Sequence, residues 1–115
     1  MNTGNLSRRS ALGIVVATLV APTTLLAAQA PAIRVHKDPN CGCCSGWVRH
    51  LEAAGFNVTV REETNLQGIR RRLGVPDDLV ACHTAEADGY VIEGHVPAAA
   101  IRRLLEERPV ATGVA

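Results

Sequence analysis

Apolar residues recur with two different periods along residues 31–115, and these periods divide the segment into seven expected elements. Alternation at every second residue is typical of strands, and recurrence at every third or fourth residue is typical of helices. Gly55, Gly74 and the Arg108-Pro109 pair mark the ends of the helices. The expected strands span residues 32–36, 56–60, 79–84 and 89–96, and the apolar stripes of the expected helices span residues 44–54, 66–73 and 98–105.

The resulting order, β-α-β-α-β-β-α, predicts one small α/β domain with the thioredoxin-like fold. Two parallel strands joined by a crossover helix are followed by a hairpin and a closing helix. In that fold, the loop entering the third strand lies beside the loop that opens the first helix. We therefore expect Cys82 to fold back onto Cys41, Cys43 and Cys44, with His83 close by.

Residues 1–30 do not follow either pattern and resemble a secretory signal peptide, so the domain is expected to span residues 31–115. Arg8 and Arg9 are the only charges, an apolar run follows, and Ala28-Gln29-Ala30 offers a cleavage site after residue 28 or 30. The paired arginines partly match a twin-arginine signal. An uncleaved membrane anchor is the alternative, although Pro22 dilutes the apolar run. We expect an exported, periplasmic protein that is not membrane-bound after cleavage.

The charge balance does not indicate a nucleic-acid partner. Without residues 1–30, ten basic residues remain of twelve against eleven acidic ones, which gives a formal charge of 10 − 11 = −1. The chain also has only one Trp, one Tyr and one Phe, too few for a base-stacking surface. The run Arg70 to Arg72 is expected to be the solvated face of a helix.

The four cysteines are the strongest chemical signal in the chain. Cys41, Cys43 and Cys44 lie within four residues at the start of the first expected helix, and Cys82 is the fourth. Adjacent cysteines cannot pair without strain, and a Cys41–Cys44 bridge would close only a very short loop. A helix N-terminus favours thiolates, which act both as nucleophiles and as metal ligands. A metal site, a thiol redox site and a structural disulfide therefore all remain open.

The third thiol of the motif favours metal over a redox couple, because thiol–disulfide exchange needs only two sulfurs. An all-sulfur site suits soft ions such as Cu(I), zinc or an iron–sulfur cluster. Cys43 and Cys44 lie about 100° apart around the helix, which hinders closure on one zinc and suits sulfurs that bridge several metals. Among the histidines, His83 has the best claim to the site. We expect His36 to point outward from its strand, His50 to be solvated and His95 to make a backbone hydrogen bond.

Three segments, DPNCGCCSGWVRHLEAAGFNV, GVPDDLVACHT and GYVIEGHVPAAAIRRLL, resemble the family of exported bacterial proteins that includes the CopG copper-resistance proteins. The resemblance covers residues 33–108. It implies a periplasmic thioredoxin-like domain that binds copper through cysteines, either as a single ion or in a multinuclear cluster. The implied ligands are Cys41, Cys43 and Cys44, and Cys82 matches the second motif. Family members continue into a tail containing Pro, Gly and Met, whereas this sequence stops at Ala115.

The sequence thus predicts a copper-binding protein that acts in copper tolerance, by sequestration or by copper redox conversion. Copper, as Cu(I), is the expected metal, with zinc as the alternative. The second hypothesis is a thiol–disulfide oxidoreductase using Cys41 and Cys44, and the third is a structural or interaction module. Oxidoreductases of this fold carry a proline just before the third strand. Here Pro76 comes several residues too early and Cys82-His83 takes that place, which favours the metal site.

Overall fold

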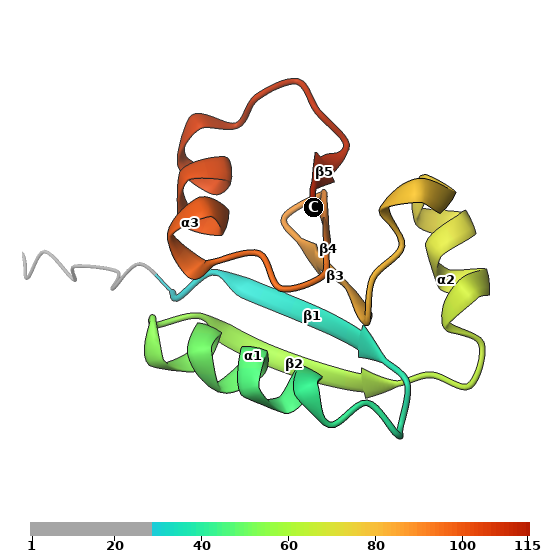
Figure 1. The fold of residues 1–115 in the computed structure, drawn as a ribbon. Helices are drawn as coiled ribbons and strands as arrows, with labels where there is room; N and C mark the ends of the chain where they lie inside the picture. The colour runs from blue at the N-terminus through green and yellow to red at the C-terminus, as the bar shows by residue number, and fades with distance from the viewer. Residues whose placement is uncertain (1–28) are drawn as a thin grey trace, which may run out of the picture.

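A computed structural model describes residues 29–115 of the chain, and the signal-peptide expectation falls almost entirely on residues outside this range. The elements follow the expected order, with a 3-10 turn and a short last strand added (Figure 1). No helix among residues 29–115 has the length and apolarity needed to cross a membrane. The elements are β1 (Ala32–Lys37), α1 (Cys43–Ala53), β2 (Asn57–Glu62), α2 (Leu66–Leu73), η1 (Asp77–Leu79), β3 (His83–Ala87), β4 (Tyr90–Glu93), α3 (Ala98–Glu107) and β5 (Gly113–Val114).

The five strands form one mixed sheet in the order β2-β1-β3-β4-β5. β1 runs parallel to β2 and antiparallel to β3, and β3 runs antiparallel to β4. This arrangement confirms the thioredoxin-like fold. β5 adds a parallel edge strand beside β4, and its two residues are too few to produce a periodic signal in the sequence.

The third strand begins later than its apolar pattern indicated. Residues 79–84 were expected to form it, but η1 occupies Asp77–Leu79 and β3 starts at His83, which pairs with Lys37. Leu79 and Val80 are exposed in the turn and loop instead of lying in the sheet. Leu79 and Val80 therefore gave a strand-like pattern outside the sheet. In the observed pairing register β3 starts at His83, so Cys82 lies in the loop just before it.

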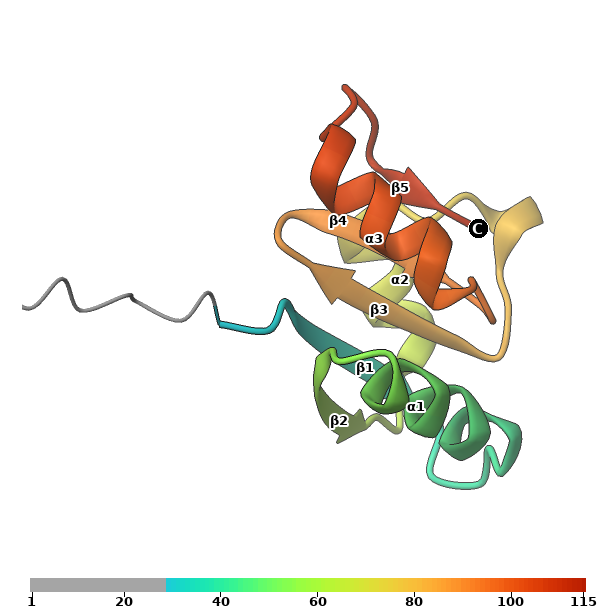
Figure 2. The ribbon, with the colours of Figure 1, turned by 90° about the vertical axis from the view of Figure 1, so that its left-hand side faces the viewer.

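One face of the sheet is apolar and is covered by α1 and α3, which lie on the same side (Figure 2). Inward residues of the strands pack there against Trp47, Leu51 and Ile101 from the two helices. The Trp47 indole Nε1 donates a hydrogen bond of 2.8 Å to the Val96 carbonyl, which satisfies its one polar atom inside the core. The strand residues of this core are Ile33, Val35, Ala85, Ala87 and Ile92.

The opposite face, on the side of α2, is polar, and it corrects two expectations. Arg70 of α2 is buried against the sheet instead of solvated, while Arg71 and Arg72 are exposed as expected. His36 is also buried, although it was expected to point outward, because two glutamates enclose its ring. Its Nδ1 lies 2.9 Å from a carboxylate oxygen of Glu63 and its Nε2 lies 2.7 Å from one of Glu86.

Candidate metal centre

A tight turn places the first three cysteines where β1 ends and α1 begins. Asp38 organises the turn, because its side chain accepts a hydrogen bond from the Asn40 amide at 2.8 Å and its carbonyl accepts one from the Cys41 amide at 3.0 Å. α1 then starts at Cys43 without a side-chain N-cap. No side chain caps the first backbone amides of α1, so the cysteines lie at a helix N-terminus with free amides, as the sequence predicted.

Three sulfurs converge at this corner of the domain. The Sγ atoms of Cys41, Cys43 and Cys82 all lie within 4.8 Å of one another, and the Cys41 and Cys43 sulfurs are 3.3 Å apart. Cys82 reaches the motif because β3 runs antiparallel to β1, so that the start of β3 lies beside the end of β1. The predicted fold-back of Cys82 is confirmed. Thiolates hold a zinc-sized ion at about 2.3 Å, so sulfurs this close together can share one ion.

Cys44 lies behind this group of three sulfurs, on the buried side of α1. Its residue is 0% exposed, and its Sγ lies 3.3 Å from the His83 Nδ1. The division follows from the helix, since consecutive residues point about 100° apart and Cys44 shares its face with Trp47 and Leu51. The four thiols therefore meet at one corner, as three outer sulfurs (Cys41, Cys43 and Cys82) and one inner sulfur (Cys44).

The environment shifts the thiol pKa values in different directions. Hydrogen bonding from the Cys44 thiol, and then from Cys43, lowers the pKa of Cys41. The same contact with Cys41 raises the pKa of Cys43, and burial raises the pKa of Cys44 to about 12. The expectation that the helix start lowers all of these pKa values is therefore wrong for Cys43 and Cys44. Within the C-x-C-C motif, Cys41 is the thiol that ionises most readily, and an incoming metal must displace protons from Cys43 and Cys44.

His83 supports the inner sulfur. Its ring is fully buried between two other rings, with centroids 4.2 Å from Trp47 and 5.2 Å from His95. Burial lowers the pKa of His83, which keeps the ring neutral at pH 7. Its Nδ1 contacts Cys44 and its Nε2 makes no hydrogen bond within residues 29–115. His83 thus orients Cys44, and its role as a metal ligand stays a prediction.

Of the two remaining histidines, His95 departs from its prediction and His50 agrees with it. His95, expected to make a backbone hydrogen bond, is exposed and stacks on His83 at the rim of the site. A signal for this position existed, because a hairpin turning at Asp88-Gly89 places His83 opposite Gly94. His50 is exposed as expected, and its Nε2 accepts a hydrogen bond of 3.1 Å from the Ala98 amide at the start of α3.

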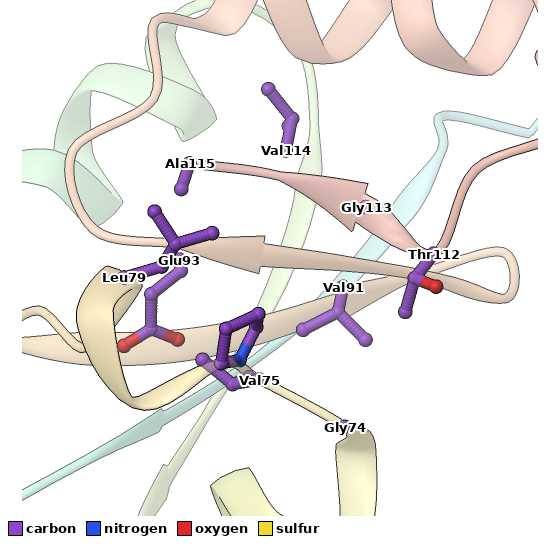
Figure 3. Close-up of a pocket in the computed structure, with 10 residues that line it drawn as sticks. Gly74, Val75, Leu79, Val91, Glu93, Thr112, Gly113, Val114 and Ala115 are labelled. Carbon is purple, nitrogen blue, oxygen red and sulfur yellow. The ribbon is translucent and has the colours of Figure 1, made fainter.

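A cavity in the described residues lies away from the thiols. It measures about 220 Å³ and lies between the C-terminal residues, β4 and the segment that follows α2 (Figure 3). Val75, Leu79 and Val91 contribute apolar side chains, and Glu93 is at one end. No cysteine lines it. Cys43 and Cys82 are exposed and Cys41 is half-buried, so the outer thiols lie at the surface of the domain.

Comparison with solved structures identifies relatives of this arrangement. A structure titled "Copper resistance protein copG- Form 2" is 50% identical, with a TM-score of 0.70, and the match covers 73% of this chain and 67% of that chain. The chain belongs to the CopG family. The structure titled "Copper resistance protein copG- Form 1" is 51% identical, with a TM-score of 0.68, and the match covers 71% of this chain and 65% of that chain.

A comparison with protein-family models matches only part of the site. The family described as "Protein of unknown function, DUF411" matches residues 79–115, which include Cys82 and His83 but not the first cysteine motif. A comparison with curated proteins gave no match. The CopG similarity and the three outer sulfurs together identify a copper-resistance homologue with a cysteine cluster able to bind metal.

Proposed function

We propose that this protein binds Cu(I) through the thiolates of Cys41, Cys43 and Cys82, with Cys44 as an inner fourth sulfur. The observation that carries the proposal is the convergence of three sulfurs within 4.8 Å. Thiolates select soft ions, and Cu(I) is one of the first-row ions that accept a sulfur-only shell. The two CopG structures, at 50% and 51% identity, are of proteins named for copper resistance, which supports copper as the metal.

The donor set fits Cu(I) better than zinc. Structural zinc sites use four ligands in a closed tetrahedron. Here the fourth sulfur, Cys44, is directed into the protein toward His83, 3.3 Å away, instead of completing a tetrahedron with the outer three. Cys43 and Cys82 are exposed, which also suits thiolates that bridge more than one copper ion. Either sequestration of Cu(I) or interconversion of copper oxidation states would serve copper resistance.

We also propose that the protein acts in the periplasm after removal of its first 28 to 30 residues. The basic start, the apolar run and the small-x-small ending at Ala28-Gln29-Ala30 support export. Mass spectrometry of the protein from its native compartment should find an N-terminus near residue 29 or 31. A full-length cytoplasmic product would contradict the export proposal without affecting the metal site.

One observation favours a second function, thiol–disulfide exchange. The Cys41 pKa is lowered by its contact with Cys44, which is the relation expected of a nucleophilic and a resolving thiol in a C-x-x-C pair. In such an enzyme Cys43 and Cys82 would be spectators. In a copper site they would hold metal. The two functions therefore predict opposite results for the same substitutions.

The test is copper per protein, measured with thermal stability under reducing, anaerobic conditions. Cys43→Ser and Cys82→Ser should each lower the copper content, and copper should raise the Tm of the wild type by mass action. Ser45→Ala, an exposed change on the same turn of α1, is the control and should bind copper as the wild type does. Unchanged copper content in Cys43→Ser, with disulfide-reductase turnover that needs Cys41 and Cys44, would replace the copper proposal with the oxidoreductase.

A further inference from the structure

The residue before Cys82 is held by a buried ion pair from the opposite, polar face of the sheet. Ala81 lies in the exposed loop between η1 and β3, yet both of its backbone polar groups have buried side-chain partners. Its amide donates to Glu93 Oε1 at 2.8 Å, and its carbonyl accepts from the Arg70 guanidinium. An exposed loop residue usually satisfies these groups with water, so this double attachment needs an explanation.

The two side chains form a closed network with Thr84. Arg70 Nε lies 3.1 Å from Glu93 Oε1, and their side chains are only 9% and 3% exposed. Arg70 Nε also lies 3.1 Å from the Thr84 hydroxyl, which in turn donates to the second Glu93 oxygen at 2.5 Å. The network thus ties α2, β3 and β4 to the backbone of the loop that carries Cys82.

Stability alone does not explain this pair. Burying two charges costs desolvation that their attraction often fails to offset, and well-packed apolar residues can replace such pairs without loss. The loop itself has little other support, since Leu79 and Val80 are exposed. Gly94, with φ of +76°, also leaves room for Ala81, because a Cβ at Gly94 would come within 3.0 Å of the Ala81 methyl. The contacts around Ala81 therefore define where Cys82 points.

We propose that Arg70 and Glu93 are positioning residues of the thiol site. By fixing Ala81 from both sides, they hold the Cys82 sulfur within reach of Cys41 and Cys43. This resembles the outer-shell groups that orient metal ligands and affect affinity without touching the metal. The metal part of the inference rests on the proposed copper function, whereas the placement of the Cys82 thiol does not.

A metal-free measurement tests the placement. In a Cys41→Ser/Cys44→Ser background, only Cys43 and Cys82 remain, and glutathione disulfide can oxidise them to one intramolecular disulfide. The two thiols lose two protons and two electrons, and each glutathione disulfide is reduced to two glutathione molecules. Adding Arg70→Met with Glu93→Leu should lower the effective concentration of the two thiols about tenfold. Arg72→Met, an exposed arginine on the same helix, is the matched control and should leave it unchanged.

A copper measurement tests the consequence. Cu(I) affinity, from competition with a chromophoric chelator, should fall about 10- to 100-fold in Arg70→Met/Glu93→Leu, as outer-shell changes do elsewhere. In a Cys82→Ser background, adding Arg70→Met/Glu93→Leu should lower the Cu(I) affinity little further. The ligand that Arg70 and Glu93 position is already absent there, so the effects are not additive. Arg70→Lys keeps the positive charge but not the forked guanidinium donor. Its Cu(I) affinity should lie between those of the wild type and the double variant.

A purely structural role would give different results. It would lower the affinity equally with and without Cys82, and it would leave disulfide closure unchanged once variants of equal Tm are compared. Either result overturns the inference. If the wild type binds no Cu(I), the copper proposal fails, and the disulfide measurement still decides whether Arg70 and Glu93 position Cys82.

Discussion

The two faces of the sheet are built by different physical means. The face under α1 and α3 is an apolar core, where strand residues such as Val35 and Ile92 pack against Leu51 and Ile101. The face under α2 carries charges, with Arg70 paired to Glu93 and His36 held between two glutamates. Apolar packing is non-directional and tolerates approximate shapes, whereas charged hydrogen bonds specify geometry. The polar face thus positions backbone near the thiols, and the apolar face stabilises the fold.

The largest expected effect comes from breaking the polar face on one side only. Glu93→Leu leaves the Arg70 guanidinium buried and unpaired, and should lower the free energy of unfolding by about 3–5 kcal/mol. Adding Arg70→Met should recover most of that loss, because the second buried charge is then removed as well. Urea unfolding of the reduced, metal-free protein measures both values.

The exposed pair on α3 is the matched control for this change. Arg103 and Glu107 contact at 2.7 Å, but their side chains are 76% and 57% exposed. Glu107→Leu should therefore cost less than about 1 kcal/mol. Equal losses for Glu93→Leu and Glu107→Leu would contradict the description of the polar face as a buried, charge-specific network.

The apolar face should respond to truncation in a different way. Ile101 is 0% exposed, so Ile101→Ala removes buried surface, leaves a cavity and should cost about 2–5 kcal/mol. No removal of a partner side chain should restore this loss, in contrast to the Arg70–Glu93 pair. Val110→Ala, at a fully exposed position, is the control and should leave unfolding within about 0.5 kcal/mol of the wild type.

A smaller effect should appear as a pH dependence of stability. Burial lowers the pKa of His83 below the ordinary 6.5. Below pH 6.5, the unfolded chain therefore binds a proton on His83 more readily than the folded chain does. The contribution of His83 to stability is complete above pH 6.5 and is lost as the pH falls toward the folded pKa. The slope is at most about 1.4 kcal/mol per pH unit for one proton. Metal-free His83→Gln should show a shallower decline between pH 6.5 and 5, and an identical slope would contradict the burial argument.

The sequence predicted the apolar face better than the polar one. Period-two and helical patterns located the elements, and topology then brought Cys82 to the first motif. The position of Cys44 was implicit too, since it is three residues before Trp47 on the buried stripe of α1. These inferences succeed because apolar burial depends mainly on periodicity.

The polar face was not predicted, because the pattern of apolar and polar residues does not show which polar side chains form buried ion pairs and hydrogen bonds. Arg70 is four residues after Leu66, on the inner side of α2, yet it was assigned to a solvated arginine run. His36 alternates correctly with Val35, but the sequence did not reveal that two glutamates enclose it. The stacking of His95 on His83 depends on the hairpin register, and the strands expected at residues 79–84 and 89–96 did not use the Asp88-Gly89 turn to fix that register.

The central claim is that the outer sulfurs hold copper, and X-ray absorption at the copper edge tests it most directly. For anaerobically loaded wild-type protein, the account predicts Cu(I) with a shell of sulfur neighbours, as three converging thiols require. Cys43→Ser and Cys82→Ser should each reduce the number of sulfur neighbours or the copper content. A shell dominated by nitrogen or oxygen, unchanged in both variants, would contradict the account.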